Sequence, residues 1–444
     1  MSASSFLRRL LGRSRPQVGQ RTQHLVSLCE ALLGERGEVS GAALAREAMA
    51  AYHQLDERGR SEFFDVLGQE FAPSPEAIGK AADAYRDDPV PRNLIRLQEV
   101  IESARQELFR RLNMAPGGTE ALVEMRRQLL RGLDEHPEWR GIDADLLHLF
   151  RSWFNRGFLR LERIDWRTSA IVLEKLIHYE AVHAIQGWRD LRRRLEADRR
   201  CFGFFHPQLR DEPLIFIEVA LTRGMSAQVQ PLLDINSPVA SPAQADCAIF
   251  YSITNCLEGL RGTSFGNLLI KQVAEDLKRE FPHLKTFATL SPIPGFCRWL
   301  GKTETRVQLA MGAEAEARLA LLAGIEVPGW HLGEVPELLQ KLLQRVCAWY
   351  LLHAKLNDEP FDPVARFHLG NGAALERLNW LGDTSESGVA RSAGMMVNYV
   401  YRLEDVEHNH ERYFANRAVV ASRAVEKLAR KSPLAAPAAR RAEA

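Results

Sequence analysis

Most of the sequence features that mark a cofactor, a metal or a membrane are missing from this chain of 444 residues. Its six cysteines are scattered, without a CxxC pair or a histidine cluster at zinc-ligand spacing, so they indicate reduced thiols rather than a metal site or a disulfide framework. No apolar run approaches the roughly 20 residues of a membrane helix. No biotin, pyridoxal or thiamine signature occurs either, so we expect no metal and no cofactor.

An excess of charge of either sign is also missing. The chain has 58 basic and 57 acidic residues, a formal net charge of +1. This balance gives no general attraction to nucleic acid or to an anionic membrane, so an anionic ligand must be held by a local site. The length is that of about two or three domains with sizeable cores.

The N-terminal segment MSASSFLRRLLGRSRP contains Ser and Arg, and no acidic residue precedes Glu30. This composition is typical of a mitochondrial presequence. The Arg-rich start is short, however, and the C-terminus is not the peroxisomal address SKL. We therefore expect a bacterial cytoplasmic protein, with the mitochondrial matrix as the alternative.

The first 150 residues have the periodicity of helices. Apolar residues in 91–114 recur every three or four positions, which predicts one amphipathic helix. A break at Pro116 and Gly117 follows, and Thr119 is expected to cap the next helix. We predict a helical domain over 1–150 with no chemistry of its own. The apolar positions are Leu94, Leu97, Ile101, Ala104, Leu108 and Leu112, and further helices are expected near 18–34, 42–53, 60–70 and 75–86.

Beyond residue 200 the pattern changes to short β-rich runs at 214–221, 248–254 and 285–290. An amphipathic helix over 268–281 joins the last two runs, so strand, loop, helix and strand form a crossover unit. The fold class we predict is α+β, with the helical domain followed by an α/β catalytic domain over 151–430. Residues 431–444 have the low complexity of a disordered tail.

The connection inside this crossover, residues 255–267, is rich in glycine and opens a helix. Unpaired backbone N–H groups and the helix dipole make such a turn an anion site, and Arg261 and Lys271 add positive charge. The spacing is that of neither a Walker loop nor a GxGxxG fingerprint. Glycines used only for turning remain an equal alternative.

Two further segments contain residues suited to chemistry. Ser291 lies in LSPIPGF at a strand end, where two prolines stiffen the backbone, although a turn serine explains it as well. His368 lies in ARFHLGNGA before an Asn-Gly turn, where it is either a proton carrier or a core histidine. Other histidines compete with it: His183, His206, His408 and His410.

These segments, in this order, resemble the malonyl-CoA decarboxylase family. The resemblance spans most of residues 150–430 and is most specific in LSPIPGF (290–296) and FHLGNGA (367–373). It also includes YEAVH (179–183), the HPxxxxEPLIFIEVALT stretch (206–222), AIFYSI (248–253), CAWYL (347–351), LNW (378–380) and MMVNYVYRLE (395–404).

The resemblance implies a fold related to acetyl-CoA-dependent N-acyltransferases and conversion of malonyl-CoA to acetyl-CoA and CO2. It implies Ser291 as the proton acceptor and His368 as the proton donor, with Ser252 and Tyr399 around the site. Some relatives carry Glu at the position of Ser264. The loop that the resemblance assigns to malonyl-CoA binding consists of Arg261, Gly262, Thr263, Ser264, Phe265, Gly266 and Asn267.

The family also implies a homo-oligomer, a dimer or tetramer assembled through the helical domain. Coenzyme A is part of the substrate rather than a cofactor, because the thioester itself accepts the electron pair. Two alternatives stay open at this point. One is an acyl-CoA N-acyltransferase, which would share the fold and the coenzyme site. The other is a non-catalytic coenzyme-A-binding interaction protein.

Overall fold

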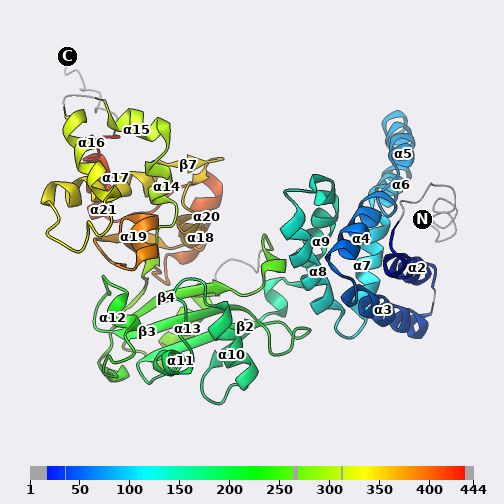
Figure 1. The fold of residues 1–444 in the computed structure, drawn as a ribbon, viewed down its shortest axis with the longest axis horizontal. Helices are drawn as coiled ribbons and strands as arrows, with labels where there is room; N and C mark the ends of the chain where they lie inside the picture. Colours follow the sequence, from blue (N-terminus) through cyan, green and yellow to red (C-terminus); the bar gives the residue numbers. More distant parts are fainter. Residues whose placement is uncertain (1–17, 36, 264–268, 312–313, 436–444) are drawn as a thin grey trace. The chain divides into compact units, whose positions relative to one another are not determined.

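The computed structural model describes residues 18–35, 37–263, 269–311 and 314–435. The chain divides into two compact units, which Figure 1 colours along the sequence. The first, called the helical unit here, contains Met1–Arg160 together with Phe205–Leu214 and Cys256–Phe265. The second, the sheet unit, contains Leu161–Phe204, Ile215–Asn255 and Gly266–Ala444. Two short segments from beyond residue 200 therefore belong to the helical unit.

The helical unit confirms the predicted helical N-terminal region. Its core contains apolar side chains from successive helices, among them Leu32, Phe63, Leu108 and Phe150, all nearly inaccessible to solvent. The helices are α2 (Gln20–Gly34), α3 (Glu38–His53), α4 (Glu57–Gln69), α5 (Pro75–Asp87), α6 (Pro91–Ile101), α7 (Ala104–Met114), α8 (Gly118–Gly132) and α9 (Arg140–Trp153), with the short 3-10 helices η1 (Pro137–Trp139) and η2 (Arg156–Phe158).

The single helix predicted for 91–114 is wrong, because the chain forms α6 and α7 there. Glu102 and Ser103 adopt extended conformations between them, and the Ser103 side chain caps α7 by accepting a hydrogen bond from the N–H of Gln106. The Ser103 hydroxyl also donates to Asp145 at 2.7 Å. The two helices differ in burial: α7 has a buried face, whereas α6 has no buried residue.

The start of α8 also differs from the prediction. Gly117, with a φ of +78°, precedes the helix as its N-cap, and the helix begins at Gly118. A Cβ on Gly118 would lie 2.0 Å from the backbone oxygen of Leu112, so only glycine fits this close approach. Thr119 lies inside the helix, and its hydroxyl donates to Asn113 Oδ1 at 2.8 Å rather than capping α8.

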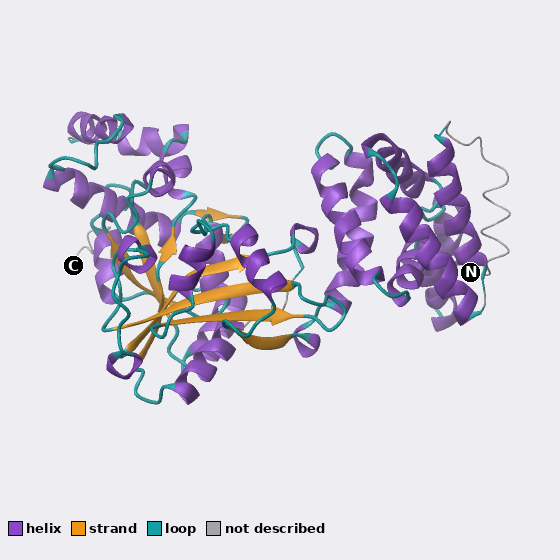
Figure 2. Cartoon of the chain, turned by 60° about the horizontal axis from the view of Figure 1, so that its bottom comes forward, coloured by secondary structure: helices purple, strands orange, loops and turns teal. Residues whose placement is uncertain are grey.

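The sheet unit contains an eight-stranded sheet in the order β1-β2-β3-β4-β5-β10-β6, with β9 paired to β10. Figure 2 shows the twisted sheet with helices packed along it. Its strands are β1 (Arg160–Ile164), β2 (Arg199–Phe205), β3 (Pro213–Thr222), β4 (Cys247–Asn255), β5 (Thr286–Thr289), β6 (Ser291–Pro292), β9 (Ala374–Asn379) and β10 (Met396–Val400). A separate two-stranded sheet consists of β7 (Lys355–Leu356) and β8 (Glu359–Pro360).

The predicted crossover is present. Strands β4 and β5 pair in parallel, and α13 (Leu269–Glu280) joins them, with Leu269, Val273 and Leu277 buried as its periodicity requires. The ladder between the strands ends at Phe250 and Thr289, followed by a hydrogen bond from Leu290 N to Phe250 O. Beyond this point β4 continues beside β3, whereas β6 continues the pairing with β10 that begins in β5. The two strands therefore diverge after Phe250 and Leu290.

The core of the sheet unit lies under these central strands. Its buried members come from β3, β4, β5 and β10, from α12 (Gln230–Leu233), and from the residues directly before α12 and after β5. They are Ala220, Val229, Leu232, Cys247, Ile249, Tyr251, Ala288, Leu290, Met396 and Val400.

The other helices lie between these strands in the sequence or follow the last of them. They are α10 (Ala170–Tyr179), α11 (Trp188–Arg194), α14 (Phe296–Leu300), α15 (Thr303–Leu309), α16 (Ala315–Ala323), α17 (Glu337–His353), α18 (Pro363–Gly370), α19 (Glu386–Ser392), α20 (Val406–Asn416) and α21 (Arg423–Arg430), with 3-10 helices η3 (Pro242–Gln244), η4 (Glu258–Leu260) and η5 (Gly324–Glu326). Within the described residues, no helix is long and apolar enough to cross a membrane. Residues 431–435 form a turn after α21, and the rest of the predicted tail lies outside the described residues.

Gly372 offers a test of the sheet unit, because it closes the turn after α18. Its φ is +81°, and an added Cβ would lie 2.0 Å from the backbone oxygen of Val406. We expect Gly372→Ala to destabilise the protein by about 2 kcal/mol or more, seen as a lower melting temperature in circular dichroism. The control is Gly41→Ala in α3, where nothing lies within 4 Å and alanine should be neutral or stabilising by up to ~1 kcal/mol. Equal melting temperatures for the two variants would contradict this account.

Candidate active site

Ser291 lies two residues after β5, where the chain continues along β10 as β6. It opens β6 and pairs with Val397, and its side chain is only 5% exposed. Pro292 and Pro294 supply no N–H group, so the ladder cannot continue and the following turn is stiff. The position at a strand end predicted for Ser291 is therefore the observed one.

His368 lies in the last turn of α18 and is 3% exposed. The helix begins at Pro363 after the N-cap Asp362, whose Oδ1 accepts hydrogen bonds from the N–H groups of Val364 and Ala365, each at 3.0 Å. The other oxygen of Asp362 accepts from the N–H of Gly295 at 3.1 Å. One buried carboxylate thus binds both the start of the histidine helix and the turn that follows Ser291.

The structure brings Ser291 and His368 together. Ser291 Oγ lies 3.0 Å from His368 Nε2, although the residues are 77 positions apart in the sequence. The Ser291 hydroxyl donates to Thr289 Oγ1 at 2.8 Å, so its oxygen is left to accept from Nε2–H. Thr289 is fully buried on β5 and also accepts from the N–H of Tyr399 at 3.2 Å. These contacts hold the serine in one orientation.

Two tyrosines of the β10 region complete the surroundings of His368. Its Nδ1 lies 2.8 Å from the hydroxyl of Tyr401, and because Nε2 carries the ring proton, Tyr401 O–H is the donor in this contact. The ring of Tyr399 stacks on the imidazole at a centroid distance of 4.6 Å and an interplanar angle of 27°. The hydroxyl of Tyr399 is buried and has no hydrogen-bond partner among the described residues.

Burial decides the protonation state of His368. It lowers the pKa of the imidazole to about 3, and burial is the sole cause of this shift. Burial likewise raises the pKa of Tyr401 well above its ordinary range. Ser291, His368 and Tyr401 are consequently all neutral near pH 7, and all three are buried.

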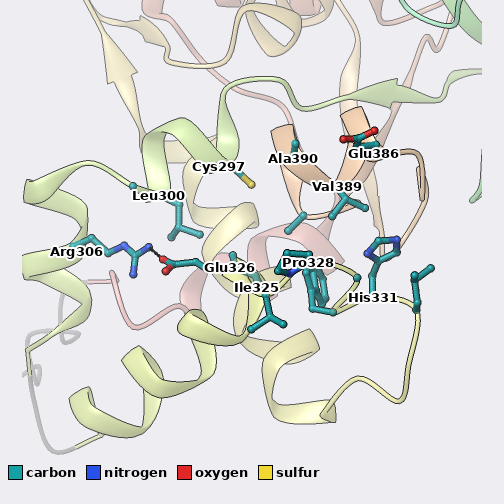
Figure 3. A pocket seen from close by; sticks show the side chains of 16 residues that line it. Cys297, Leu300, Arg306, Ile325, Glu326, Pro328, His331, Glu386, Val389 and Ala390 are labelled. Atoms are coloured by element: carbon teal, nitrogen blue, oxygen red, sulfur yellow. Dashed lines mark hydrogen bonds and ion pairs between the residues drawn. The ribbon is translucent and has the colours of Figure 1, made fainter.

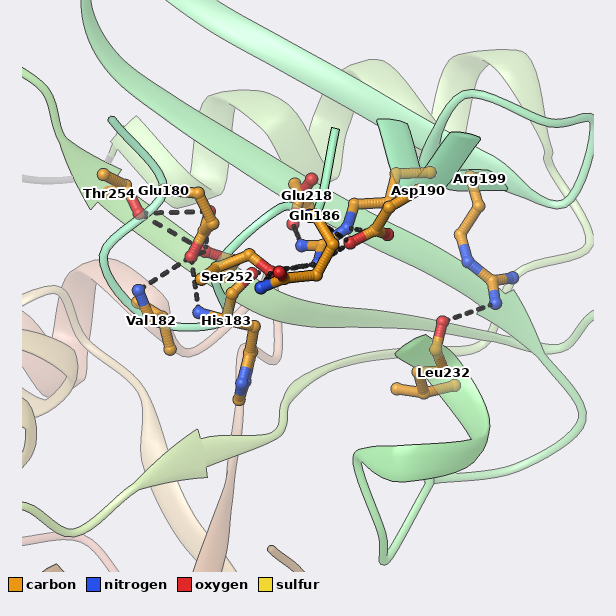
Figure 4. Close-up of polar contacts among 12 residues, drawn as sticks. Glu180, Val182, His183, Gln186, Asp190, Arg199, Glu218, Leu232, Ser252 and Thr254 are labelled. Atoms are coloured by element: carbon orange, nitrogen blue, oxygen red, sulfur yellow. Dashed lines mark hydrogen bonds and ion pairs between the residues drawn. The ribbon is translucent and has the colours of Figure 1, made fainter. Parts of the chain in front are cut away.

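Ser252, which the family resemblance placed around the site, belongs to a separate cluster of hydrogen-bonded residues (Figure 4). Its Oγ lies 2.8 and 2.7 Å from the two carboxylate oxygens of Glu180. The same carboxylate accepts from the N–H groups of Val182 and His183 and from the hydroxyl of Thr254. Ser252 therefore fixes the turn after α10, and no hydrogen bond links it to Ser291 or His368.

An ionic network adjoins this cluster beneath β3 and β4. Arg194 of α11 donates to Glu218 at 2.8 Å and to Asp190 at 2.9 Å, and all three are buried. Burial raises the pKa of Glu218 to about 7, against the opposing effect of the Arg194 charge. The pairing register shifts beside Glu218, which faces Ser252, so that Tyr251 forms a bulge in β4. This bulge lies where β4 separates from β5.

The glycine-rich loop is described only in part. Arg261 is exposed, Gly262 has a φ of +81°, and Thr263 is 8% exposed with a buried hydroxyl that has no described partner. These residues belong to the helical unit. The other predicted loop residues, Ser264, Phe265, Gly266 and Asn267, lie outside the described residues.

Lys271, which we expected to add charge to this loop, is already paired. Its Nζ lies 2.5 Å from Glu407 Oε1 on α20, and this hydrogen bond raises the pKa of the lysine. The competing histidines also have structural explanations. His410 donates to the backbone oxygen of Gly370 at 2.7 Å, and His206 contacts the backbone oxygen of Trp153 within the helical unit. His408 is exposed on α20 and His183 is buried beside Glu180.

A pocket of about 680 Å³ lies elsewhere in the sheet unit (Figure 3). It is lined by one side of α14, by α19 and by residues 325–332, and neither Ser291 nor His368 is among its walls. The ion pair between Arg306 and Glu326, at 2.7 Å, borders it. The pocket is therefore separate from the serine and histidine pair.

Among the described residues, one group has the spacing of metal ligands: Asp65, His136 and Glu138 of the helical unit. Each already has a protein partner. Trp139 Nε1 donates to Asp65 at 2.8 Å, and His136 Nδ1 lies 3.0 Å from Glu138 Oε1 while its ring stacks on Trp139. These contacts explain the cluster without an ion, and the expectation of no metal stays a prediction.

Sequence reasoning missed three residues that position the pair: Thr289, Asp362 and Tyr401. Asp362 had a detectable signal, since Asp before Pro is a common helix start. Thr289 and Tyr401 had none, because a threonine in a strand and a tyrosine near a strand end are ordinary sheet residues. Their roles depend on pairing across strands that are far apart in the sequence.

The comparison with known proteins agrees with these motifs. The family described as malonyl-CoA decarboxylase C-terminal domain matches residues 157–441, and the corresponding N-terminal domain family matches 71–154. The mitochondrial malonyl-CoA decarboxylase of the goose Anser anser anser is 38% identical over 341 residues, which are 72% of this chain and 68% of that protein. The mouse enzyme is 37% identical over 350 residues, covering 74% of this chain and 71% of that protein.

Solved structures give the same result over nearly the whole chain. The crystal structure of malonyl-CoA decarboxylase from Rhodopseudomonas palustris is 48% identical, with a TM-score of 0.87 over 93% of this chain and 100% of that one. The structure from Agrobacterium vitis is 47% identical, with a TM-score of 0.85 over 91% of this chain and 99% of that one.

The buried imidazole generates a prediction about acid stability. Because the folded pKa of His368 is about 3, below the ordinary value of about 6.5, the unfolded chain binds more protons between these values. Stability is therefore lost as the pH falls from about 6.5 towards 3. We expect His368→Gln, which cannot titrate, to show a smaller drop in melting temperature between about pH 7 and pH 4 than the parent protein. The control is His24→Gln, at an exposed position, which should leave the dependence of the melting temperature on pH unchanged. Parallel curves for the parent and His368→Gln would show that burial does not hold this imidazole neutral.

Proposed function

Because the chain belongs to the malonyl-CoA decarboxylase family, we propose that its Ser291 and His368 pair removes CO2 from malonyl-CoA and leaves acetyl-CoA. The observation that carries this proposal is the 3.0 Å contact between Ser291 Oγ and His368 Nε2, made by the two motifs that resemble the family most specifically. The protein is then a carboxy-lyase. Its dry pair is suited to a reaction in which charge develops on a thioester.

The chemistry requires stabilisation of an enolate. Breaking the bond between C2 and the carboxylate carbon releases CO2 and leaves the electron pair shared between C2 and the thioester oxygen. C2 then takes one proton, so that malonyl-CoA and a proton give acetyl-CoA and CO2. Donors already aimed at the developing oxyanion are the largest contribution in many enzymes. The thioester accepts the electron pair itself, so we propose that no cofactor takes part.

We assign the proton to His368. In the free protein its pKa is about 3, with no charged group to offset burial. A bound malonyl carboxylate brings a negative charge into this dry site, and a nearby negative charge raises the pKa of an imidazole. His368 therefore takes up a proton together with the substrate. Its imidazolium stabilises the enolate as CO2 leaves and then gives the Nε2 proton to C2.

The neighbours of His368 act by holding it. Tyr401 donates to Nδ1 in the free protein, and this contact keeps Nε2–H directed at Ser291. When Nδ1 is protonated, the Tyr401 oxygen accepts from it instead, by rotation of its hydroxyl. Ser291, anchored by Thr289 at 2.8 Å, orients the malonyl group beside Nε2. Tyr399 has a buried hydroxyl without a described partner, which is available to the substrate. Ser252 acts indirectly, by fixing Glu180 and the turn that follows it.

The divergence of β4 from β5 supports a site for the extended arm of coenzyme A. From Tyr251 to Asn255, β4 pairs with β3 on one side and has no described strand on the other. An extended ligand with amide groups can pair with such an edge as an additional strand would. We propose that the pantetheine arm binds here and that residues 261–267 bind the phosphates. This arrangement supports the acyltransferase-like fold inferred from the sequence.

The two alternatives are not favoured. The relatives at 36–38% identity are named malonyl-CoA decarboxylases. The alignments cover more than two thirds of their length. A chain that resembled the family only in its coenzyme site would leave the contact between Ser291 and His368 unexplained. Incubation with malonyl-CoA alone separates the three functions, because only a decarboxylase makes acetyl-CoA without an amine acceptor.

Assembly and location are also proposals. Helix α6 carries Leu94, Ile95 and Ile101 at its surface, and an apolar helix face without a partner supports a homo-oligomer formed through the helical unit. We place the enzyme in the bacterial cytoplasm, because the bacterial structures named above are 47–48% identical. The goose and mouse relatives, at 37–38%, are mitochondrial.

The roles of the pair are tested by Ser291→Ala and His368→Ala. We expect each change to lower turnover of malonyl-CoA by about 100- to 1,000-fold, because each removes a preorganised group from the reacting atoms. Coenzyme A binding should remain. The measurements are CO2 release and the dissociation constant of coenzyme A. The control is Ser392→Ala, a buried serine that contacts only backbone oxygens. Near-native turnover in either variant would remove that residue from the mechanism.

The proton uptake by His368 is tested with an unreactive malonyl-CoA analogue. Its binding heat is measured by calorimetry in buffers of different ionisation enthalpy at about pH 7. We expect a net proton uptake in the parent protein, because the carboxylate raises the pKa of an imidazole that is neutral beforehand. His368→Gln should bind without this uptake. Identical uptake in both proteins would assign the proton to another group.

A further inference from the structure

The loop proposed for the phosphates begins in a segment that packs on helices α8 and α9. Residues 256–265 belong to the helical unit, although they follow β4 directly in the sequence. A Cβ on Gly259 would lie 2.0 Å from the backbone oxygen of Val123 on α8, so the two backbones are in direct contact. On the α9 side, Leu147 lies 3.9 Å from the Cβ position of Gly262.

Arg126 of α8 joins this segment to the helices. Its side chain is 2% exposed, and its Nη1 donates to the backbone oxygens of Gly259 and Arg261, each at 2.7 Å. Its Nε donates to Asp143 of α9 at 2.8 Å, so the charge is balanced and the guanidinium is held from both sides. A buried arginine that binds two carbonyls of one turn fixes the conformation of that turn.

The planarity of the peptide bond gives this contact a direction. In a trans peptide, the carbonyl oxygen of one residue and the N–H of the next point to opposite sides. Because the Arg261 oxygen points at Arg126, the N–H of Gly262 points away from it. That N–H has no hydrogen-bond partner among the described residues. Arg126 therefore aims an unpaired donor away from the helices, at the start of the loop.

Thr263 adds a second donor at the same place. Its N–H is used within the turn, donating to Leu260 at 2.9 Å, whereas its buried hydroxyl has no described partner. An unpartnered buried hydroxyl beside an unpaired N–H matches the needs of a phosphate oxygen.

We infer that Arg126 is a positioning residue for the coenzyme's phosphates, so that the helical unit contributes to substrate affinity without touching the substrate. This inference rests on the proposed function, because it takes Gly262 and Thr263, at the start of the proposed loop, as donors to the phosphates. It assigns the helical unit a part in the reaction that its sequence did not indicate. The contribution is confined to the nucleotide end of the substrate.

The test compares malonyl-CoA with malonyl-pantetheine, which lacks the nucleotide and its phosphates. For Arg126→Met we expect the KM of malonyl-CoA to rise about tenfold or more, since hydrogen bonds from a charged donor to two carbonyls are lost. The kcat of malonyl-CoA and the KM of malonyl-pantetheine should stay within about twofold of the parent values. Thr263→Val should raise the same KM, by a smaller factor. An equal rise for both substrates, or no rise for either, would overturn the inference.

Two further variants separate positioning from folding. Arg126→Lys keeps a charge beside Asp143 and serves if the methionine variant does not fold; it should raise the KM of malonyl-CoA less than Met does, because one ammonium replaces the guanidinium fork. Arg127→Met, on the same helix, removes an ion pair with Glu124 and should leave the KM of both substrates unchanged.

Failure of the proposed function has a different signature. If the parent protein releases no CO2 from malonyl-CoA, the decarboxylase proposal fails, and the dissociation constants of coenzyme A and pantetheine then replace the KM values. If the parent protein binds coenzyme A more tightly than pantetheine, and Arg126→Met removes this difference in dissociation constant, the inference is supported without any turnover. A parent that does not prefer coenzyme A over pantetheine would overturn it.

Discussion

The buried carboxylate of Asp362 is the contact on which the geometry of the reaction site depends. Its two oxygens accept from the N–H groups of Val364 and Ala365 at the start of α18, from the N–H of Gly295 and from the hydroxyl of Tyr350 on α17. Burial raises its pKa, while these hydrogen bonds oppose the shift. Ser291 and His368 lie on segments that do not pair directly with each other, and this carboxylate links the backbones of the two segments.

The chemistry of the pair follows in turn from the absence of an ionised group in direct contact with His368. His368 contacts Ser291 and Tyr401, and its ring stacks on Tyr399; none of these groups is ionised near pH 7. A low dielectric strengthens each hydrogen bond and makes the incoming carboxylate the dominant charge. A charged partner such as aspartate would instead have protonated the imidazole before the substrate arrived. In the proposed mechanism, the site thus responds electrostatically to its own substrate.

The sequence predicted those parts of the fold that depend on local periodicity. Strands β3, β4 and β5 and helix α13 follow from alternating or helical apolar spacing, and so did most of the N-terminal helices. The break between α6 and α7 was missed because the apolar spacing continues through Ser103, whose role is set by Asp145, 42 residues away. Ser291 and His368 were recognisable only through a family resemblance, since each alone fits a structural role. Thr289 and Tyr401 were unpredictable because cross-strand pairing places them.

The contrast between Ser291 and Ser252 shows why the type of residue alone does not identify a site. Both are buried serines on neighbouring parts of one sheet. Ser252 donates to the carboxylate of Glu180, which also accepts from two backbone N–H groups and from Thr254, and the ion pair of Arg194 with Glu218 lies beside it. Ser291 meets only neutral groups, so its environment offers an incoming anion no competing charge. The groups of the Ser252 cluster are bonded to one another, whereas an uncharged site leaves electrostatic capacity for a ligand. The distribution of charge around each serine therefore separates the structural position of Ser252 from the reactive position that we propose for Ser291.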